Sequence, residues 1–240
     1  MVKRTRFSST QSLASQSSKG SYGKRTARTK GTAQKSLVNY KAPLYFPKWG
    51  FPRRMYIAHK YVEQVTLTST TSSVGTHVIK CNGMYDPNHT GSGHQPMYFD
   101  NCAAIYDHFT IVKSMFRAKV TPAAQYSAAS TVTLYVDDDT TSAVTLPAAA
   151  EMAGGQIQVF PPNCTDTIHH MRNNWSARGT FGGDPLSNDN LQGTGTSDPT
   201  ELSYYTLQVQ ANSGATQSFY ATVEVLYYAI WDELKTQDIN

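Results

Sequence analysis

Apolar and polar residues alternate with a period of two from residue 57 onward, in runs separated by Gly, Pro, Asn, Asp and Ser. This pattern predicts short β-strands joined by turns and loops. Helical patterns are limited to two or three turns, and only residues 147–153, followed by Gly154 and Gly155, have the composition of a short helix. Eight strands are expected, at about residues 59–70, 75–82, 109–121, 130–138, 156–160, 166–181, 203–211 and 218–231.

Three of these runs predict which face of the sheet each side chain occupies, because successive residues of a strand point to opposite sides of the sheet. In the run 218–231 one face is apolar and the other carries Tyr220, Thr222, Glu224 and Tyr228; the apolar positions are Phe219, Ala221, Val223, Val225, Tyr227, Ala229 and Trp231. In the run 203–211 the alternation sets Tyr205, Leu207, Val209 and Ala211 against Thr206, Gln208 and Gln210.

The run 109–121 differs, because its polar face is cationic. Val112, Ser114, Phe116, Ala118 and Val120 alternate with Lys113, Met115, Arg117 and Lys119. Two interpretations of these cations are equally compatible with the sequence. They contact nucleic acid, or they pair with acidic residues of neighbouring strands.

The connections between the expected strands indicate the fold class. A simple meander would use tight hairpins, yet residues 83–108, 139–155 and 182–202 form long connections. Eight strands with several long crossing loops favour an all-β, double-Greek-key jelly roll of two four-stranded antiparallel sheets. The loops at 83–108 and 182–202 are the expected sites of contact between subunits, since a fixed scaffold leaves its loops free for specific contacts.

Charge divides the chain into two parts. Residues 1–60 hold fourteen Lys and Arg and no acidic residue, whereas the rest hold the other seven cations and all seventeen acids. We expect a disordered basic arm at residues 1–40, an aromatic and proline-rich connector at 41–56, and the jelly roll at 57–240. The connector aromatics either stack on bases or tuck against the domain edge.

A basic segment of this kind indicates nucleic-acid binding, because Lys and Arg that neutralise phosphates release condensed counterions without reading bases. The alternatives are a nuclear-import signal, which is compatible with binding, and a tail that only aids solubility. The residues expected to contact phosphate are Lys3, Arg4, Arg6, Lys19, Lys24, Arg25, Arg28, Lys30, Lys35, Lys41, Lys48, Arg53 and Arg54.

Several motifs of the domain resemble those of one family. Residues 82–100 read NGMYDPNHTGSGHQPMYFD, residues 112–120 read VKSMFRAKV, residues 175–182 read WSARGTFG and residues 227–231 read YYAIW. Together with the Asn- and Gly-rich loop at 188–195, they resemble the capsid proteins of circoviruses and related circular single-stranded DNA viruses that encode a replication initiator. In that family the arm is often a dense Arg block, whereas here Lys and Arg are sparser.

The resemblance implies a coat protein that assembles with itself into the smallest (T=1) icosahedral shell. Its partners would be a single-stranded DNA genome facing the arms, the host nuclear-import machinery and a host receptor that the sequence does not identify. Its locations would be the virion and, during assembly, the host nucleus. The rival hypothesis is a non-assembling nucleic-acid-binding or lectin-like jelly roll with a basic tether.

No enzyme activity, metal or cofactor is predicted. His89 and His94 share a loop with Asp86 and Asp100, but their spacing matches neither HExxH nor CxxC. Asp137-Asp138-Asp139 resembles a calcium cluster but is typical of a solvated turn, and His169-His170 with Arg172 lacks an identifiable nucleophile. The three Cys are odd in number and far apart, which argues against a disulfide framework. No run is long and apolar enough to span a membrane.

Overall fold

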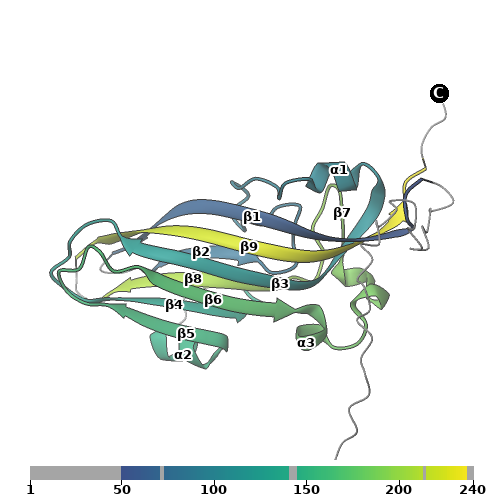
Figure 1. Ribbon diagram of the computed structural model, residues 1–240. Helices are drawn as coiled ribbons and strands as arrows, with labels where there is room; N and C mark the ends of the chain where they lie inside the picture. Colours follow the sequence, from purple (N-terminus) through teal and green to yellow (C-terminus); the bar gives the residue numbers. More distant parts are fainter. Residues whose placement is uncertain (1–49, 71–72, 141–144, 213–214, 237–240) are drawn as a thin grey trace, which may run out of the picture. The chain divides into compact units, whose positions relative to one another are not determined.

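Two antiparallel sheets packed face to face make up the described part of the chain (Figure 1). The computed structural model describes residues 50–70, 73–140, 145–212 and 215–236. One sheet has the order β1 (Arg54–Ser69), β9 (Gln217–Leu234), β3 (Tyr106–Pro122) and β6 (His169–Ser176), and β7 (Gln192–Thr194) also pairs with β3. The other has the order β2 (Gly75–Lys80), β8 (Tyr204–Ala211), β4 (Ser130–Asp137) and β5 (Ala153–Phe160).

The strand pairing is nested. β1 pairs with β9, β2 with β8, β3 with β6 and β4 with β5, so the chain behaves like one long antiparallel hairpin folded over. Pairing of β9 with β3 and of β8 with β4 then closes each sheet. This arrangement is the double-Greek-key jelly roll, which confirms the predicted fold class.

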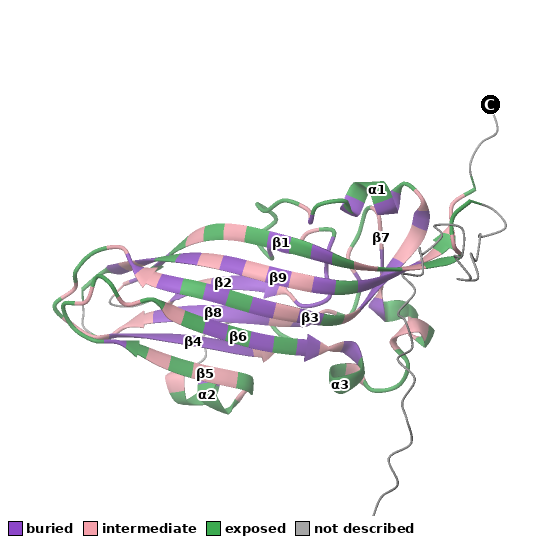
Figure 2. Ribbon diagram, viewed as in Figure 1, coloured by how far each residue is buried: buried purple, intermediate pink, exposed green. Residues whose placement is uncertain are grey.

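The core lies between the two sheets and follows the predicted alternation. All seven apolar-face residues of β9 are buried, as are Tyr205, Leu207 and Val209 of β8. Figure 2 shows buried and exposed residues alternating along β3 and β6. One expected inward position is wrong: the register shifts between Ile111 and Lys113, so Ile111 belongs to the core while Val112 is only half-buried. A β-bulge adds one residue, and this offsets the alternation on either side of it.

Several local elements differ from the sequence expectation. The expected strand 166–181 begins at His169 and ends at Ser176, whose Oγ accepts a hydrogen bond from the Gly179 N–H and caps α3 (Ala177–Phe181). The predicted short helix is α2 (Leu146–Glu151), and Gly154 and Gly155 lie in β5. The short elements α1 (Phe99–Ala103), η1 (Pro185–Ser187), η2 (Asp189–Leu191) and β7 were not predicted. In the described ranges, the helices are too short to cross a membrane.

Candidate nucleic-acid interface

Most cations predicted to bind phosphate precede the described part of the chain. The following lie outside it: Lys3, Arg4, Arg6, Lys19, Lys24, Arg25, Arg28, Lys30, Lys35, Lys41 and Lys48. Arg53 and Arg54 are described: Arg54 is the first residue of β1, and Arg53 directly precedes it. Arg54 Nε donates to Asp232 Oδ2 at 2.6 Å, so its charge is compensated at the end of β9. The Arg53 side chain is exposed.

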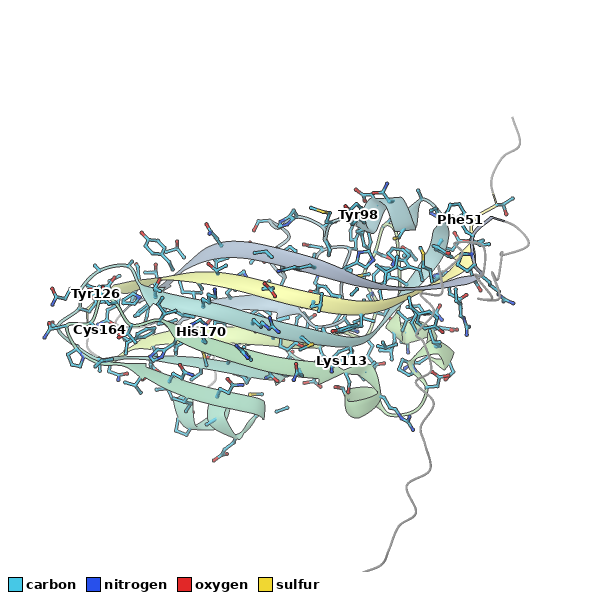
Figure 3. All side chains as sticks on the ribbon, in the orientation of Figure 1. Phe51, Tyr98, Lys113, Tyr126, Cys164 and His170 are labelled. Carbon is cyan, nitrogen blue, oxygen red and sulfur yellow. The ribbon has the colours of Figure 1, made fainter. Side chains whose placement is uncertain are left out.

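A second group of cations lies on the sheet formed by β1, β9, β3 and β6. Of the seven Lys and Arg that follow residue 60, four point outward from β3 and β6, namely Lys113, Arg117, Lys119 and Arg172. We call these four residues the cationic sheet face. Lys113 and His170, labelled in Figure 3, mark opposite ends of this row. The other residues after position 60 carry a net negative charge, so this face holds most of the positive charge of the domain.

The register of β3 against β6 places two guanidinium groups opposite each other. Arg117 is the direct partner of Arg172, and Lys119 is the partner of His170. Like charges directly opposite on one face of an antiparallel pair destabilise the sheet. These two cross-strand pairs lie about 7 Å apart along the strands, because they are separated by two residues. The β3–β6 pair therefore presents a positively charged row without an acidic side chain of its own, and on the other side of β3 the register partner of Arg117 is Glu224 of β9.

The nearest acidic side chain compensates only part of this charge. Glu224 on β9 lies 2.8 Å from Lys60 Nζ and 3.7 Å from Arg117 Nη1. Within the described residues, Lys113, Lys119 and Arg172 form no ion pair with any carboxylate. Of the two interpretations of the β3 cations, pairing with acids therefore holds for Arg117 alone.

Hollows and exposed aromatic rings accompany the cations. A hollow of about 380 Å³ is lined by Arg117, Lys119, His170, Arg172, Thr222 and Glu224. A second hollow, of about 360 Å³, continues past Thr222 toward β1 and is lined by Tyr220. Tyr220 is 58% exposed, and Tyr228, the register partner of Lys113, is 37% exposed.

The edge strand β6 is held in place by side chains of β5, which position Arg172. The Gln156 amide donates to the Arg172 carbonyl and accepts from the Arg172 N–H at 3.4 Å. Gln158 Nε2 donates to the His170 carbonyl at 3.4 Å. These amides replace the missing strand neighbour of β6, so the Arg172 and His170 backbone is fixed while their side chains remain outside.

The loops expected to form subunit contacts are tied to each other. Lys80 Nζ lies 2.8 Å from Asp198 Oδ2, and Asp198 Oδ1 accepts from the Tyr85 N–H at 2.9 Å. Asn82 Nδ2 donates to the Glu201 carbonyl at 2.8 Å. Burial raises the pKa of Asp198, and the Lys80 ammonium opposes that shift. The 83–98 and 195–203 segments therefore form one connected surface.

The groups considered as metal or catalytic candidates do not converge. His94 stacks on Tyr61 with ring centroids 4.7 Å apart, whereas His89 meets Tyr204 edge to face at 5.5 Å. His169 packs against Phe160, away from His170 on the outward face. Where the chain is described, no three His, Cys, Asp or Glu side chains are grouped as a metal site would require, and its cysteines are unpaired.

Sequence reasoning found the β3 cations but not their neighbours. His170 and Arg172 were noted as a local pair, and Tyr220, Glu224 and Tyr228 as one face of the last strand. The signal that would join them is the pairing register of β3 with β6 and β9. Register depends on which strands become neighbours, so local sequence does not supply it.

The fold and these contacts define a jelly-roll protein. No protein-family model matches the sequence, and no curated protein is significantly similar to it. Among solved structures, the chain is similar to that of Desmodium yellow mottle tymovirus, with 14% identity, TM-score 0.40 and coverage of 98% of this chain and all of the other.

Two further solved structures show the same level of likeness. The Macrobrachium rosenbergii nodavirus particle has 12% identity, TM-score 0.39 and coverage of 77% of this chain and 97% of the other. The 60-mer of the BFDV capsid protein has 13% identity, TM-score 0.39 and coverage of 78% and 98%. At such scores the fold rests on the strand pairing described above and not on these superpositions.

Proposed function

We propose that the chain is the coat protein of a small virus: the jelly roll assembles with copies of itself into a closed shell, and the basic arm binds the packaged genome. The observation that carries this proposal is the separation of charge. Fourteen cations without one acid precede a domain whose remaining residues hold seven cations and seventeen acids. A jelly roll alone is common to capsid, lectin and cupin domains, whereas a polyanion-binding leader suits a protein that encloses nucleic acid.

The finer proposal is a circovirus-like T=1 icosahedral shell around single-stranded DNA. It rests on the motif resemblance at residues 82–100, 112–120, 175–182 and 227–231. Arms with this charge repel one another, and nucleic acid removes the repulsion, so packaging and shell closure are expected to be coupled. The tied loops at 83–98 and 195–203 are proposed to contribute contacts between subunits. An import role of the arm and location in the host nucleus during assembly belong to the same proposal.

Size-exclusion chromatography and cryo-electron microscopy of the expressed full chain test the proposal. We expect megadalton particles whose absorbance ratio at 260 and 280 nm reports nucleic acid, and whose extracted nucleic acid is degraded by S1 nuclease and DNase but not by RNase. Monomers or small oligomers at every salt concentration and pH would contradict assembly and favour the tethered-module alternative. Shells that contain only RNA would contradict the DNA assignment while leaving the coat function intact.

A further inference from the structure

We infer that the outward face of the β1–β9–β3–β6 sheet is a second binding site for single-stranded nucleic acid, separate from the basic arm. The inference rests on the proposed function for its biological setting and on the described residues for its chemistry. The site comprises the cationic sheet face, Lys113, Arg117, Lys119 and Arg172, together with the exposed rings of Tyr220 and Tyr228.

The electrostatic part follows from the arrangement of charges. The domain after residue 60 is acidic overall, yet more than half of its Lys and Arg lie on this one face. Arg117 faces Arg172, and Lys119 faces His170. A bound anion removes the repulsion between Arg117 and Arg172, because phosphate oxygens accept hydrogen bonds from both guanidinium groups.

A polynucleotide fits this surface better than isolated anions. The Arg117–Arg172 pair and Lys119 are offset by about 7 Å along the strands, so they present cations in a row suited to successive phosphates. The hollows next to them meet at Thr222 and extend the surface toward Tyr220. The Glu224 carboxylate in this hollow lies 2.8 Å from Lys60 Nζ, and this ion pair reduces its electrostatic repulsion of a bound anion.

The exposed tyrosine rings favour binding of single strands over duplexes. Tyr220 and Tyr228 are exposed on the same face, on the strand next to the cations. Single-strand-binding proteins combine a positive groove with aromatic side chains on which unpaired bases stack, and stacking does not depend on base identity. Duplex DNA hides its base faces, so the tyrosines add affinity only for single strands.

The test compares full-length variants in binding a 12-nucleotide single-stranded DNA by fluorescence anisotropy, at subunit concentrations where light scattering shows no assembly. The sheet variant is Lys119→Gln with Arg172→Gln, which keeps the aliphatic stems. Its matched control is Arg178→Gln with Lys235→Gln, which removes the same charge elsewhere. The arm variant is Lys24→Gln, Arg25→Gln, Arg28→Gln and Lys30→Gln.

The sheet variant is expected to lower the slope of log K against log salt by about 1.4, because each lost phosphate contact on a single strand contributes about 0.7. Binding at 0.1 M salt is expected to weaken by about an order of magnitude. Glu224→Gln is expected to tighten binding. Because poor folding can only weaken binding, this increase tests the inference even if the sheet variant folds poorly. Tyr220→Ala with Tyr228→Ala is expected to weaken single-strand binding about tenfold with an unchanged salt slope, and to leave duplex binding unaffected.

The inference is overturned if the sheet variant and its control have equal affinity and slope. It is also overturned if the sheet variant changes only subunit association, which would assign this face to a second copy of the chain. In either case a loss of binding in the arm variant leaves the proposed function standing. Conversely, unchanged binding in the arm variant with a loss in the sheet variant contradicts the proposed role of the arm and supports the sheet site.

Discussion

Removing the cation of the largely buried Lys80–Asp198 pair is expected to destabilise the jelly roll strongly. The two side chains are 12% and 10% exposed, and Nζ lies 2.8 Å from Oδ2. In the Lys80→Met variant the Asp198 carboxylate keeps the Tyr85 N–H at 2.9 Å but loses its only cationic partner in the described structure. Breaking a buried pair from one side leaves an uncompensated charge, which costs about 3 kcal/mol at the lower end of the observed range.

The reverse change is expected to cost less, because the two partners differ in their remaining contacts. In Asp198→Asn, Lys80 still has Asp86 Oδ2 at 3.7 Å, and the side-chain oxygen can still accept the Tyr85 N–H. The loss is expected to be about 1.5 kcal/mol, typical of one hydrogen bond to a charged group.

The exposed pair Arg54–Asp232 is the matched control. Its Nε to Oδ2 distance is shorter, 2.6 Å, but the Arg54 side chain is 48% exposed. Water and salt screen such a pair, so Arg54→Met is expected to cost less than about 1 kcal/mol. Burial, and not distance, therefore decides the ranking of the three variants.

The effect of Lys80→Met should also depend on pH. Without the ammonium, burial holds the pKa of Asp198 further above its unfolded value, so the folded state takes up a proton that the unfolded state does not. Stability then falls as pH rises through the folded pKa and is regained at lower pH. The gap between Lys80→Met and wild type is expected to narrow from pH 7 to pH 5.

Urea unfolding of the unassembled subunit, followed by fluorescence of the buried Trp175 and Trp231, gives the free energies. A loss of about 3 kcal/mol corresponds to a Tm lower by about 6 to 12 °C for a domain of this size. Equal losses in Lys80→Met and Arg54→Met, or a larger loss in Asp198→Asn than in Lys80→Met, would refute the reasoning.

Three further predictions concern the core, the pH response and the arm. A methyl group at Gly193 would collide with the Phe109 ring, so Gly193→Ala is expected to lower the unfolding free energy by about 1 to 3 kcal/mol in urea titrations; a neutral effect would mean that β7 moves freely. Burial lowers the pKa of His59, which accepts the Trp231 indole N–H at 3.0 Å, so stability should fall as pH drops below about 6.5. A His59→Gln variant should show a flatter pH profile of Tm, and an unchanged profile would exclude His59 as the cause. Deleting residues 1–36 should reduce the nucleic-acid content of particles more than it changes the circular dichroism spectrum or Tm, whereas particles with unchanged content would contradict the packaging role of the arm.

Local pattern predicted the elements well where burial alternates along a strand. The alternation in β9 identified its buried face, because a period of two directly reflects which side of a sheet meets the core. In β8 it identified the core positions Tyr205, Leu207 and Val209, but Thr206 and Gln208 on the other face are buried as well. It failed where one residue changes the count: the bulge between Ile111 and Lys113 shifted the inward position from Val112. It also extended β6 past Ser176, where a side-chain cap begins a helix.

The two candidate nucleic-acid sites also differ in how far the sequence alone reveals them. The arm is a property of composition, since fourteen cations without an acid are visible before any fold is known. The sheet site is not, because Arg117 and Arg172 are far apart in sequence and become partners only through the pairing of β3 with β6. Glu224 likewise gained its place between Lys60 and Arg117 from the β1–β9–β3 order.

By itself the sequence determined the all-β class, the inward face of the longest strand and the separation of a basic leader from an acidic domain. These features depend on residue type and on spacing of a few positions. The tertiary structure alone decided which strands became neighbours and in what register, and with that which charges face each other across the sheet. Those pairings join residues far apart along the chain, and their energy is gained only when both sheets close over a common core.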